Sequence, residues 1–294
     1  MFDNIVITGF ADEIDPFLDR QMEVLEKLHI SHIEMRGVDG RNLVEYSEAE
    51  AKEIKRRLDG RGFSLSAVGS PLGKIRITDD FTGHMELFKH TVEIAHIMGT
   101  PNIRMFSFYG PEESKSCGET ADSRGGGTCP WRDAVMERLG QFADYAAAHE
   151  VVLLHENEKG IYGEMAEGCL DILKQFAGEH FKAVFDFANF VQAGQNTLEA
   201  YERLKPYIAY IHVKDALFED GSVVPAGQGD GSVAEILGRL KGDGYSGYLS
   251  IEPHLSDFTG FASLERGGRI GEKLSGEEAF TLAHDSLLKI LEKL

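Results

Sequence analysis

Four short apolar stretches each end in a side chain that can bind a metal ion or move a proton. These side chains are Glu156, Asp186, His212 and Glu252. Each follows a few strand-forming residues and precedes a loop. Three carboxylates and one imidazole form an oxygen-rich ligand set that suits Mn2+, Mg2+ or Co2+ and tolerates Zn2+. The sequence therefore predicts one divalent metal ion, with Mn2+ as the first expectation.

A single acidic residue at the end of a strand usually has a simpler role. It caps the next helix or lies in a solvated loop. Four such residues at successive strand-loop junctions are harder to explain in this way. Because parallel α/β folds collect their chemistry at the carboxyl ends of the strands, we expect the four to converge on one face of the fold.

Two of the four candidate ligands, the carboxylates of Glu156 and Glu252, also suit proton transfer. A divalent ion can chelate adjacent oxygens of a hydroxy-ketone or hydroxy-aldehyde and stabilise the enediolate formed when the α-proton leaves. Glu156 and Glu252 come from the fifth and eighth expected strands, so they can face a substrate from different sides. This arrangement predicts isomerisation or epimerisation. A lyase or dehydratase that uses the same enediolate is the alternative.

The elements that must position these residues alternate regularly between strand and helix. Apolar runs predict strands at 4–10, 32–36, 63–70 and 102–109, and further strands that begin near 151, 182, 207 and 247. Helical spacing predicts a helix from Asp15-Pro16, helices at 47–60, 82–98, 131–149, 164–176, 198–204 and 233–240, and a last one from 275. Eight units without a seam predict a single (β/α)8 TIM barrel over 1–294. An open doubly wound sheet is the alternative, but TGFADEID after the first strand is not a phosphate-binding glycine motif.

Helix starts and loop lengths add detail to this barrel. Ser47 with Glu50, and Ser275 with Glu278, each have the spacing of a capping box. The connections at 110–130 and 254–274 are unusually long, and both follow strands. We therefore expect them on the catalytic face, as lids.

Charge and composition exclude several classes of protein. Acidic residues number 49 against 30 basic ones, which gives a net charge of −19 that would repel nucleic acid. No apolar run is long enough to span a membrane, and the first residues do not resemble a signal peptide, so the expected location is cytoplasmic. The 3 cysteines lack metal-ligand spacing, which favours incidental thiols over a disulfide framework.

Several motifs resemble one known superfamily. They are LLHENE, FDFAN, YIHVKDA, PAGQGDG and LSIEPH, in this order along the chain. Together they resemble the xylose isomerase-like barrels, specifically the sugar phosphate isomerase/epimerase group, which includes D-tagatose 3-epimerase, hydroxypyruvate isomerase, inosose dehydratase and endonuclease IV. The resemblance covers all eight units and does not specify one reaction. It implies that Glu156, Asp186, His212 and Glu252 bind the metal, and that Glu156 and Glu252 double as the acid/base pair.

The chain departs from parts of that group. Many of its epimerases have a substrate-contacting histidine three residues after the aspartate, where this chain has Asn189. An amide can bind a sugar hydroxyl but cannot change its charge near neutral pH, which leaves the ketohexose 3-epimerase reaction open. Endonuclease IV needs additional histidines that SAVGSPLG, RMFSFYG and AGQGDG lack, so a nuclease is not expected.

Other side chains near these strand ends are candidates for substrate binding. Lys214 could hold an oxyanion or a phosphate, or pair with Asp215. His254 could help to expel a leaving group, or be an ordinary loop histidine. Glu158 could bind a hydroxyl or orient a ligand.

Two more predictions concern charged and aromatic residues around the pocket. Arg36 could reach the pocket, but the sequence favours a bond to Glu34 or to a neighbouring carboxylate inside the barrel. His155 faces away from Glu156 by strand alternation and is expected to pack in the core. Phe258 and Phe261 could close over a sugar. The expected substrate is a small carbohydrate or keto-polyol. The sequence does not specify which sugar it is or whether it is phosphorylated, and it leaves open whether the protein is a homo-oligomer. A sugar-binding barrel without turnover is a further alternative.

Overall fold

A computed structural model describes residues 5–111, 129–256 and 274–294. Its main sheet contains eight parallel strands. They are β1 (Ile5–Gly9), β2 (His32–Met35), β5 (Ser64–Gly69), β6 (Asn102–Met105), β7 (Val152–Glu156), β8 (Phe181–Asp186), β9 (Ile208–Val213) and β12 (Gly247–Ile251). These are the eight strands that the sequence predicts.

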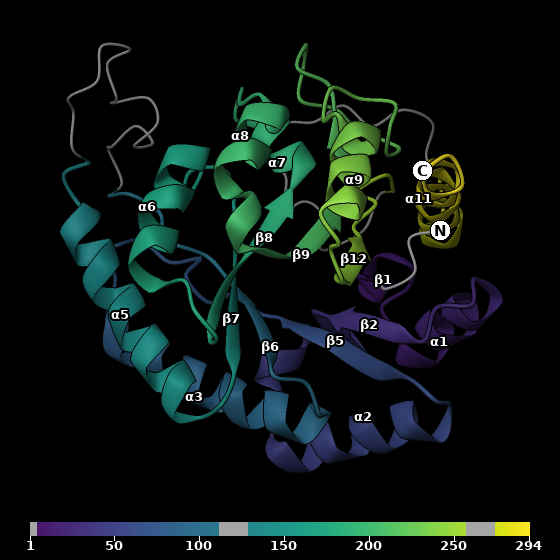
Figure 1. Ribbon diagram of the computed structural model, residues 1–294. Helices are drawn as coiled ribbons and strands as arrows, with labels where there is room; N and C mark the ends of the chain where they lie inside the picture. Colours follow the sequence, from purple (N-terminus) through teal and green to yellow (C-terminus); the bar gives the residue numbers. More distant parts are fainter. Residues whose placement is uncertain (1–4, 112–128, 257–273) are drawn as a thin grey trace.

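The strands follow one another around a nearly closed barrel. Their order is β1-β12-β9-β8-β7-β6-β5-β2, and β1 and β2, at the two ends of this order, lie against each other. Figure 1 shows the strands at the centre of the molecule with the helices around them. The fold is a single (β/α)8 TIM barrel, as predicted.

The helices form the outer layer of the barrel. They are α1 (Leu18–Lys27), α2 (Glu48–Gly60), α3 (Phe81–Met98), α5 (Arg132–Ala148), α6 (Ala166–Phe176), α7 (Phe187–Gln192), α8 (Thr197–Leu204), α9 (Val233–Gly242) and α11 (Gly276–Leu291). Both predicted capping boxes are present, at the starts of α2 and α11. Within the described residues no helix is long and apolar enough to cross a bilayer.

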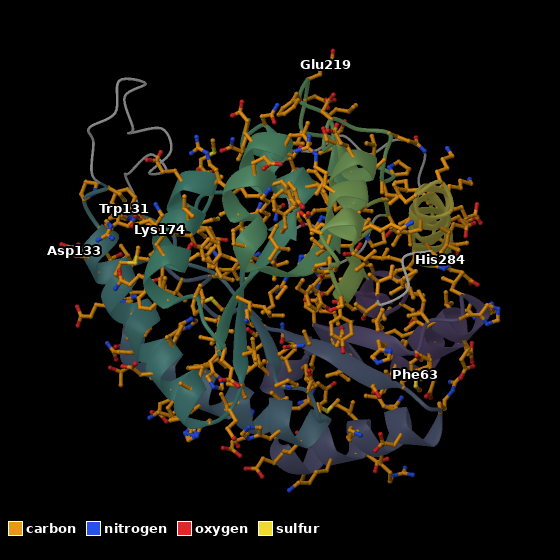
Figure 2. The ribbon with its side chains drawn as sticks, in the orientation of Figure 1. Phe63, Trp131, Asp133, Lys174, Glu219 and His284 are labelled. Atoms are coloured by element: carbon orange, nitrogen blue, oxygen red, sulfur yellow. The ribbon has the colours of Figure 1, made fainter. Side chains whose placement is uncertain are left out.

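The core has two layers of different character. Apolar side chains of the strands and helices fill the space between barrel and outer layer; for example, Phe88, Phe142 and Leu139 have no exposed surface. Polar side chains run through the barrel interior instead, with hydrogen bonds of 2.8 Å from Ser66 to both Thr8 and Tyr210. The barrel interior can therefore support ionised groups at its mouth. Most side chains in Figure 2 that reach outward belong to the helical layer.

Two local predictions were wrong, and one short helix was missed. The first helix begins at Leu18, because Asp15 accepts a hydrogen bond from the Phe17 amide in a turn that precedes the helix. Strand β6 ends at Met105, since Phe108 has a positive φ of 65° that an extended strand does not permit. The short helix α7, directly after β8, was not predicted at all.

The connections contain two small hairpins that the sequence pattern did not reveal. They pair β3 (Gly37–Val38) with β4 (Arg41–Asn42), and β10 (Asp215–Ala216) with β11 (Val223–Val224). The two predicted lids, with Phe258 and Phe261, lie almost wholly outside the described residues.

The cysteines are not all alike. Cys169 is a buried free thiol, as expected of an incidental cysteine. Cys129 is disulfide-bonded, so the prediction of incidental thiols was wrong for this residue.

Candidate metal centre and active site

The four predicted ligands meet at the carboxyl end of the barrel. One ligand atom from each of Glu156, Asp186, His212 and Glu252 lies within 4.8 Å of the other three. All four side chains are buried. Strand register explains this meeting, because Asp186 of β8 pairs with His212 of β9, which in turn pairs with Ser250, two residues before Glu252. The convergence that the sequence predicts is therefore present.

His212 presents its two ring nitrogens to different sides. Its Nδ1 faces the cluster, 3.0 Å from Glu156 Oε1, 3.8 Å from Glu252 Oε2 and 3.9 Å from Asp186 Oδ2. Its Nε2 lies 3.1 Å from Glu34 Oε2, on the interior side. Burial lowers the pKa of His212, but Glu34 and Glu156 outweigh it and hold this pKa well above its usual range, so Nδ1 favours its protonated form. Displacement of the Nδ1 proton, with Nε2 still donating to Glu34, would leave the Nδ1 lone pair to a metal ion.

Glu34 is a site residue that sequence reasoning considered only as a partner of Arg36. Its carboxylate lies inside the barrel with no exposed surface and accepts a hydrogen bond of 2.6 Å from Ser250. It fixes the ring orientation of His212, which is the usual role of a carboxylate behind a ligating histidine. Strand alternation places Glu34 on the inner face of β2, but no pattern in the sequence indicates that it reaches β9.

The chemistry of Asp186 supports a cation at this place. Its Oδ1 accepts a hydrogen bond of 2.7 Å from the Asn189 amide and so caps α7. Its buried Oδ2 has no hydrogen-bond partner among the described residues, although the Lys214 ammonium lies 3.3 Å away. Burial, and then the neighbouring carboxylates Glu252 and Glu156, raise the pKa of Asp186 to about 7 despite Lys214. A divalent ion would relieve this penalty, so the residues present fit a metal.

The two predicted acid/base carboxylates are held in their ionised form. Burial opposes the ionisation of Glu156, but His212 and Arg104 outweigh it and lower its pKa to about 2. Burial opposes the ionisation of Glu252 as well, yet Lys214 and His254 hold its pKa well below the usual range. Both groups are thus available as metal ligands or as proton acceptors.

Lys214 belongs to this cluster rather than to a pair with Asp215. Its Nζ lies 3.0 Å from Glu252 Oε2 and 3.3 Å from Asp186 Oδ2. Asp215 instead accepts hydrogen bonds of 2.9 to 3.0 Å from the amides of Gly227, Gly229 and Gly231. The glycine-rich turn therefore anchors Asp215, and a Cβ on Gly229 would clash with the Ala216 carbonyl oxygen at 2.5 Å.

Arg36 lines the pocket, but carboxylates already surround it. It binds Asp12 through Nε at 2.8 Å, Glu13 at 3.3 Å and Glu252 at 3.4 Å, and it makes no ion pair with Glu34 within the described residues. Of the two roles open from the sequence, the bond to neighbouring carboxylates inside the barrel is the one observed.

His254 lies beside the candidate acid/base residue Glu252. Its Nε2 is 3.1 Å from Glu252 Oε1 and 3.3 Å from Glu13 Oε1, and its backbone amide donates to Glu13 at 2.8 Å. Burial and Lys214 lower its pKa, but Glu13 and Glu252 outweigh them and raise it to about 9. His254 is therefore a protonated group next to the base.

Asn189 and Glu158 both line the pocket. Asn189 donates to Glu156 Oε1 at 3.3 Å and to the Asn157 carbonyl at 2.9 Å, while its buried Oδ1 has no hydrogen-bond partner in the described chain. Glu158 binds the Lys74 ammonium at 3.0 Å and accepts from the Lys159 amide at 2.8 Å. The structure thus brings all the predicted substrate-binding residues to one pocket. His155, by contrast, packs away from it against Gly163, as predicted.

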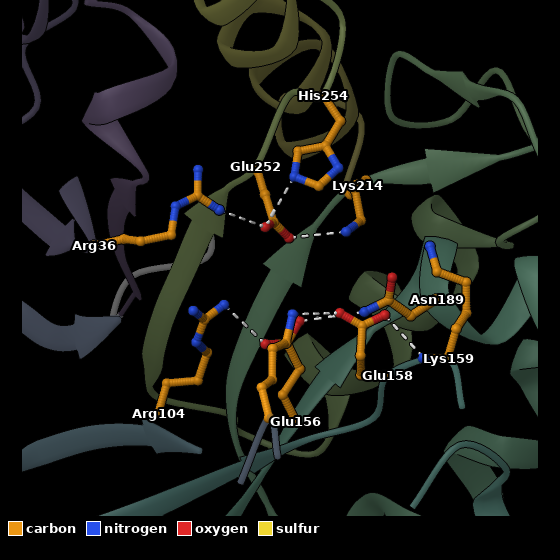
Figure 3. Close-up of a pocket in the computed structure, with 10 residues that line it drawn as sticks. Arg36, Arg104, Glu156, Glu158, Lys159, Asn189, Lys214, Glu252 and His254 are labelled. Carbon is orange, nitrogen blue, oxygen red and sulfur yellow. Dashed lines mark hydrogen bonds and ion pairs between the residues drawn. The ribbon is translucent and has the colours of Figure 1, made fainter. Parts of the chain in front are cut away.

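Figure 3 shows how these side chains surround the pocket. The lining residues are Arg36, Lys74, Arg104, Glu156, Glu158, Lys159, Asn189, Lys214, Glu252 and His254. Sequence reasoning missed Arg104, whose Nη1 lies 3.1 Å from Glu156 Oε2. It also missed the two lysines, Lys74 and Lys159. Alternation in NIRM places Arg104 on the inner face of β6, which was the one available signal.

Barrel and site together define a (β/α)8 protein with a buried cluster of carboxylate and imidazole groups that could hold a metal ion. The family described as xylose isomerase-like TIM barrel matches residues 22–275. The chain belongs to this family.

Solved structures with the same architecture confirm the fold. The IolI protein with a bound zinc atom has a TM-score of 0.73 at 19% identity, with 99% of this chain and 98% of that chain covered. A D-tagatose 3-epimerase-like protein has a TM-score of 0.69 at 17% identity, with 98% and 99% covered. A Mycobacterium smegmatis xylose isomerase-like barrel in complex with magnesium has a TM-score of 0.65 at 17% identity, with 97% of each covered.

Similar curated proteins cover different shares of the chain. A 3-dehydroshikimate dehydratase of Bacillus anthracis is 21% identical over 264 residues, 87% of each chain. An uncharacterized protein of Methanocaldococcus jannaschii is 31% identical over 99 residues, so the match spans only 33% of that relative's length. The neighbours with named activities include an epimerase-like protein and a dehydratase.

Proposed function

We propose that this protein is a divalent-metal-dependent isomerase or epimerase of a small sugar or keto-polyol. The observation that carries the proposal is the meeting of four buried ligand atoms, from Glu156, Asp186, His212 and Glu252, within 4.8 Å of one another. The similarity to a D-tagatose 3-epimerase-like structure and to the zinc-bound IolI protein supports it.

The metal would polarise two adjacent substrate oxygens and stabilise the enediolate that forms when the α-proton leaves. Mn2+ is the first expectation, with Mg2+, Co2+ and Zn2+ as alternatives, because the ligand set is rich in oxygen. The residues of this chain perform the remaining tasks. Glu34 holds the ring of His212, and Asn157 holds the backbone of Asp186, whose amide donates to Asn157 Oδ1 at 3.0 Å.

Glu156 and Glu252 then act as the proton-transferring pair. Both are ionised and buried, so either can remove the proton α to the carbonyl. Arg104 steadies Glu156 at 3.1 Å, and Lys214 steadies Glu252 at 3.0 Å. Return of the proton by the same carboxyl group to the neighbouring carbon moves the carbonyl. Inversion of the centre needs a proton delivered from the other face, which Glu252 would first take up from the protonated His254, 3.1 Å away; water then restores the proton of His254 as Glu156 releases the one that it removed.

A dehydratase that acts through the same enediolate is the second candidate. The 3.1 Å contact between His254 Nε2 and Glu252 Oε1 favours it, since a protonated imidazole can give its proton to a departing hydroxyl. Asn189 stands where many epimerases of the resembling group have a histidine. The similarity to the 3-dehydroshikimate dehydratase of Bacillus anthracis adds support.

Proton exchange in deuterium oxide tests the proposal. The Mn2+-loaded protein is incubated with a panel of keto sugars and keto-polyols, and NMR follows the carbon-bound hydrogens and the products. An isomerase or epimerase incorporates deuterium and forms a stereoisomer or a shifted carbonyl, whereas a dehydratase forms an unsaturated product.

The matched controls are the Glu156→Gln variant, which should exchange hydrogen about 10² to 10⁴ times more slowly, and the metal-free protein, which should exchange none. A Glu156→Gln variant that binds metal and keeps full turnover would remove Glu156 as the base. A wild-type protein that retains no divalent metal would favour a sugar-binding barrel without turnover.

A further inference from the structure

A row of polar side chains fills the barrel interior on the inner side of His212. The row comes from five strands, and each member has at most 1% of its surface exposed: Thr8, Glu34, Ser66, Tyr210 and Ser250. Ser66 Oγ lies 2.8 Å from Thr8 Oγ1 and 2.8 Å from the Tyr210 hydroxyl oxygen. The Tyr210 hydroxyl in turn makes a hydrogen bond with the Glu34 carboxylate. Three buried hydroxyl groups therefore lead, one after another, to the carboxylate that contacts His212.

The carboxylate at one end decides the direction of these hydrogen bonds. An ionised carboxylate can only accept, so the Tyr210 hydroxyl donates to Glu34. Because a hydroxyl group has a single hydrogen, the Tyr210 oxygen then accepts from Ser66, and Ser66 accepts from Thr8. Hydrogen bonds in such a chain polarise one another in a buried, low-dielectric interior. All three hydroxyl dipoles thus point towards Glu34.

Glu34 is held by two further groups. Ser250 donates to its Oε2 at 2.6 Å, and His212 Nε2 lies 3.1 Å from the same oxygen and 3.2 Å from Oε1. A rotation of the carboxylate away from His212 would break the hydrogen bonds from Ser250 and Tyr210. Because buried donors without an acceptor are costly, the carboxylate is fixed in the position that serves His212.

Tyr210 also contacts His212 directly with its ring. The centres of the two rings lie 5.8 Å apart in a T-shaped arrangement, and the ring of Phe10 makes a similar contact with His212 at 5.2 Å. Alternation along β9 places Tyr210 and His212 on the same inner face. The ring contact and the hydrogen bond can be separated, since Tyr210→Phe keeps the first and removes the second.

We propose that Tyr210 is a positioning residue of the candidate metal centre. Its hydroxyl donates to Glu34, which keeps Nδ1 of His212 directed at the other three candidate ligands. Ser66 and Thr8 fix the direction in which this hydroxyl donates. The effect on a metal ion rests on the proposed function, whereas the orientation of the imidazole ring does not require a bound ion.

Two measurements on the purified protein test the proposal. Titration calorimetry gives the affinity for Mn2+, and NMR of the metal-free protein gives the signal of the His212 Nε2–H group. Tyr210→Phe should weaken Mn2+ binding about two- to tenfold, because the loss of one hydrogen bond contributes on this scale. In the metal-free protein the same variant should shift the Nε2–H signal upfield, since a carboxylate that is held less firmly makes a weaker hydrogen bond.

Tyr248→Phe is the matched control. The ring of Tyr248 lies 5.4 Å from that of Tyr210, so the substitution removes a hydroxyl from the neighbouring tyrosine of the same barrel. Tyr245 donates to the backbone carbonyl of Tyr248 at 3.0 Å, but the Tyr248 hydroxyl makes no hydrogen bond within the described residues. Tyr248→Phe should therefore leave the Mn2+ affinity and the His212 signal at their wild-type values.

A double-mutant cycle with Ser66→Ala tests the direction of the chain. Ser66→Ala alone should weaken Mn2+ binding less than Tyr210→Phe does, because it removes only the donor behind the Tyr210 hydroxyl. Added to Tyr210→Phe it should have no further effect, since Ser66 acts on Glu34 only through Tyr210. Losses that simply add in the double variant would contradict the chain.

Two other results would overturn the proposal: a Tyr210→Phe variant with the Mn2+ affinity and the His212 signal of the wild type, or equal losses in Tyr210→Phe and Tyr248→Phe. Should Tyr210→Phe fail to fold, Ser66→Ala carries the test, and an unchanged His212 signal in Ser66→Ala would then overturn it. Failure of the proposed function has a different outcome. In that case the wild-type protein does not bind Mn2+, while the His212 signal still responds to Tyr210→Phe and not to Tyr248→Phe.

Discussion

The two halves of the barrel contribute different chemistry to the same pocket. The second half, β7, β8, β9 and β12, supplies all four candidate metal ligands. The first half, β1, β2, β5 and β6, supplies three of the five lining cations, with Arg36 just after β2, Lys74 after β5 and Arg104 within β6, whereas Lys159 and Lys214 come from the second half. Under the proposed function, this difference would mean a division of tasks, in which the second half holds the metal and moves the proton and the first half mainly orients the substrate.

Glu34 is the exception to this division. It belongs to β2, in the first half, but its carboxylate reaches across the interior to His212 Nε2 at 3.1 Å. The first half therefore also determines the orientation of one candidate ligand. Variants in both halves of the barrel test this difference.

Loss of a proton-transferring carboxylate should have the largest effect. Glu156→Gln or Glu252→Gln should lower the rate of hydrogen exchange from the substrate carbon by about 10² to 10⁴, since general acid-base catalysis contributes this much. Deuterium incorporation followed by NMR measures it. Glu167→Gln, on the exposed surface of α6, is the matched control and should have wild-type activity. Equal activity of Glu252→Gln and the control would remove Glu252 from the mechanism.

Loss of a candidate ligand from the second half should abolish tight metal binding. Asp186→Asn should weaken Mn2+ by more than about 100-fold, because a direct ligand contributes more than the outer-shell partners whose loss costs 10- to 100-fold. Titration calorimetry measures the affinity. The side-chain oxygen of the new asparagine can still accept the hydrogen bond from the backbone amide of Asn189. Circular dichroism should therefore show an intact fold. Unchanged Mn2+ affinity would exclude Asp186 as a ligand.

Glu34→Gln should weaken Mn2+ binding by about 10- to 100-fold, because the ring of His212 loses its charged partner. This variant tests the exception directly, since the change lies in the first half and the effect is expected in the second. The affinity is again measured by calorimetry. Restoration of part of the affinity by Glu34→Asp would support a positioning role, whereas wild-type affinity of Glu34→Gln would contradict it.

Removal of a cation from the first half of the barrel should strengthen the binding of Mn2+. Arg104→Met removes a positive charge 3.1 Å from Glu156, so Mn2+ should bind more tightly, by about fivefold or more, because the repulsion removed at about 4 Å amounts to about 1 kcal/mol even at the dielectric constant of water. Turnover should fall in the same variant, because Glu156 and the substrate lose a positioning group. Weaker Mn2+ binding by Arg104→Met would contradict the division of tasks between the two halves.

The smallest expected effect concerns a loop of the first half. His84 Nε2 accepts a hydrogen bond of 2.7 Å from the amide of Gly73, next to Lys74, and burial together with Arg138 lowers the pKa of His84 to about 4. Because this pKa lies below the unfolded value of about 6.5, the neutral ring stabilises the fold fully above pH 6.5, and the stabilisation is lost as the pH falls towards 4.

Denaturant unfolding at pH 7 and pH 5 measures this contribution. We expect His84 to account for about 1 kcal/mol of the stability lost between the two pH values, after allowance for solvent screening. His84→Gln, which cannot titrate but can still accept the hydrogen bond, should lose correspondingly less. An identical loss in the two proteins would show that His84 does not titrate with folding.

Much of the fold and most of the residues that line the pocket follow from local sequence patterns. Apolar runs that alternate with helical spacing indicate the eight units, and a strand that ends in an acid or an imidazole indicates a ligand. Since these ligands all occupy strand ends, parallel topology alone brings them together. Asp186 could therefore be predicted before any contact was known.

The remaining site residues depend on contacts that local patterns do not contain. Arg104 meets Glu156 across a sequence separation of 52 residues, and Glu34 meets His212 across 178. Both contacts depend on barrel closure and strand register, which decide how far a side chain reaches across the interior. Helix α7 was missed for another reason, since its start is capped by Asp186, a residue already interpreted as a ligand.

Anomalous X-ray scattering from a crystal grown with Mn2+ tests the central claim most directly. The account predicts one strong peak at the barrel mouth, with ligand atoms of Glu156, Asp186, His212 and Glu252 each about 2.0 to 2.2 Å away. A map without such a peak would contradict it. A peak only at the second cluster of acidic and histidine side chains, Glu13, Glu252 and His254, would contradict it as well.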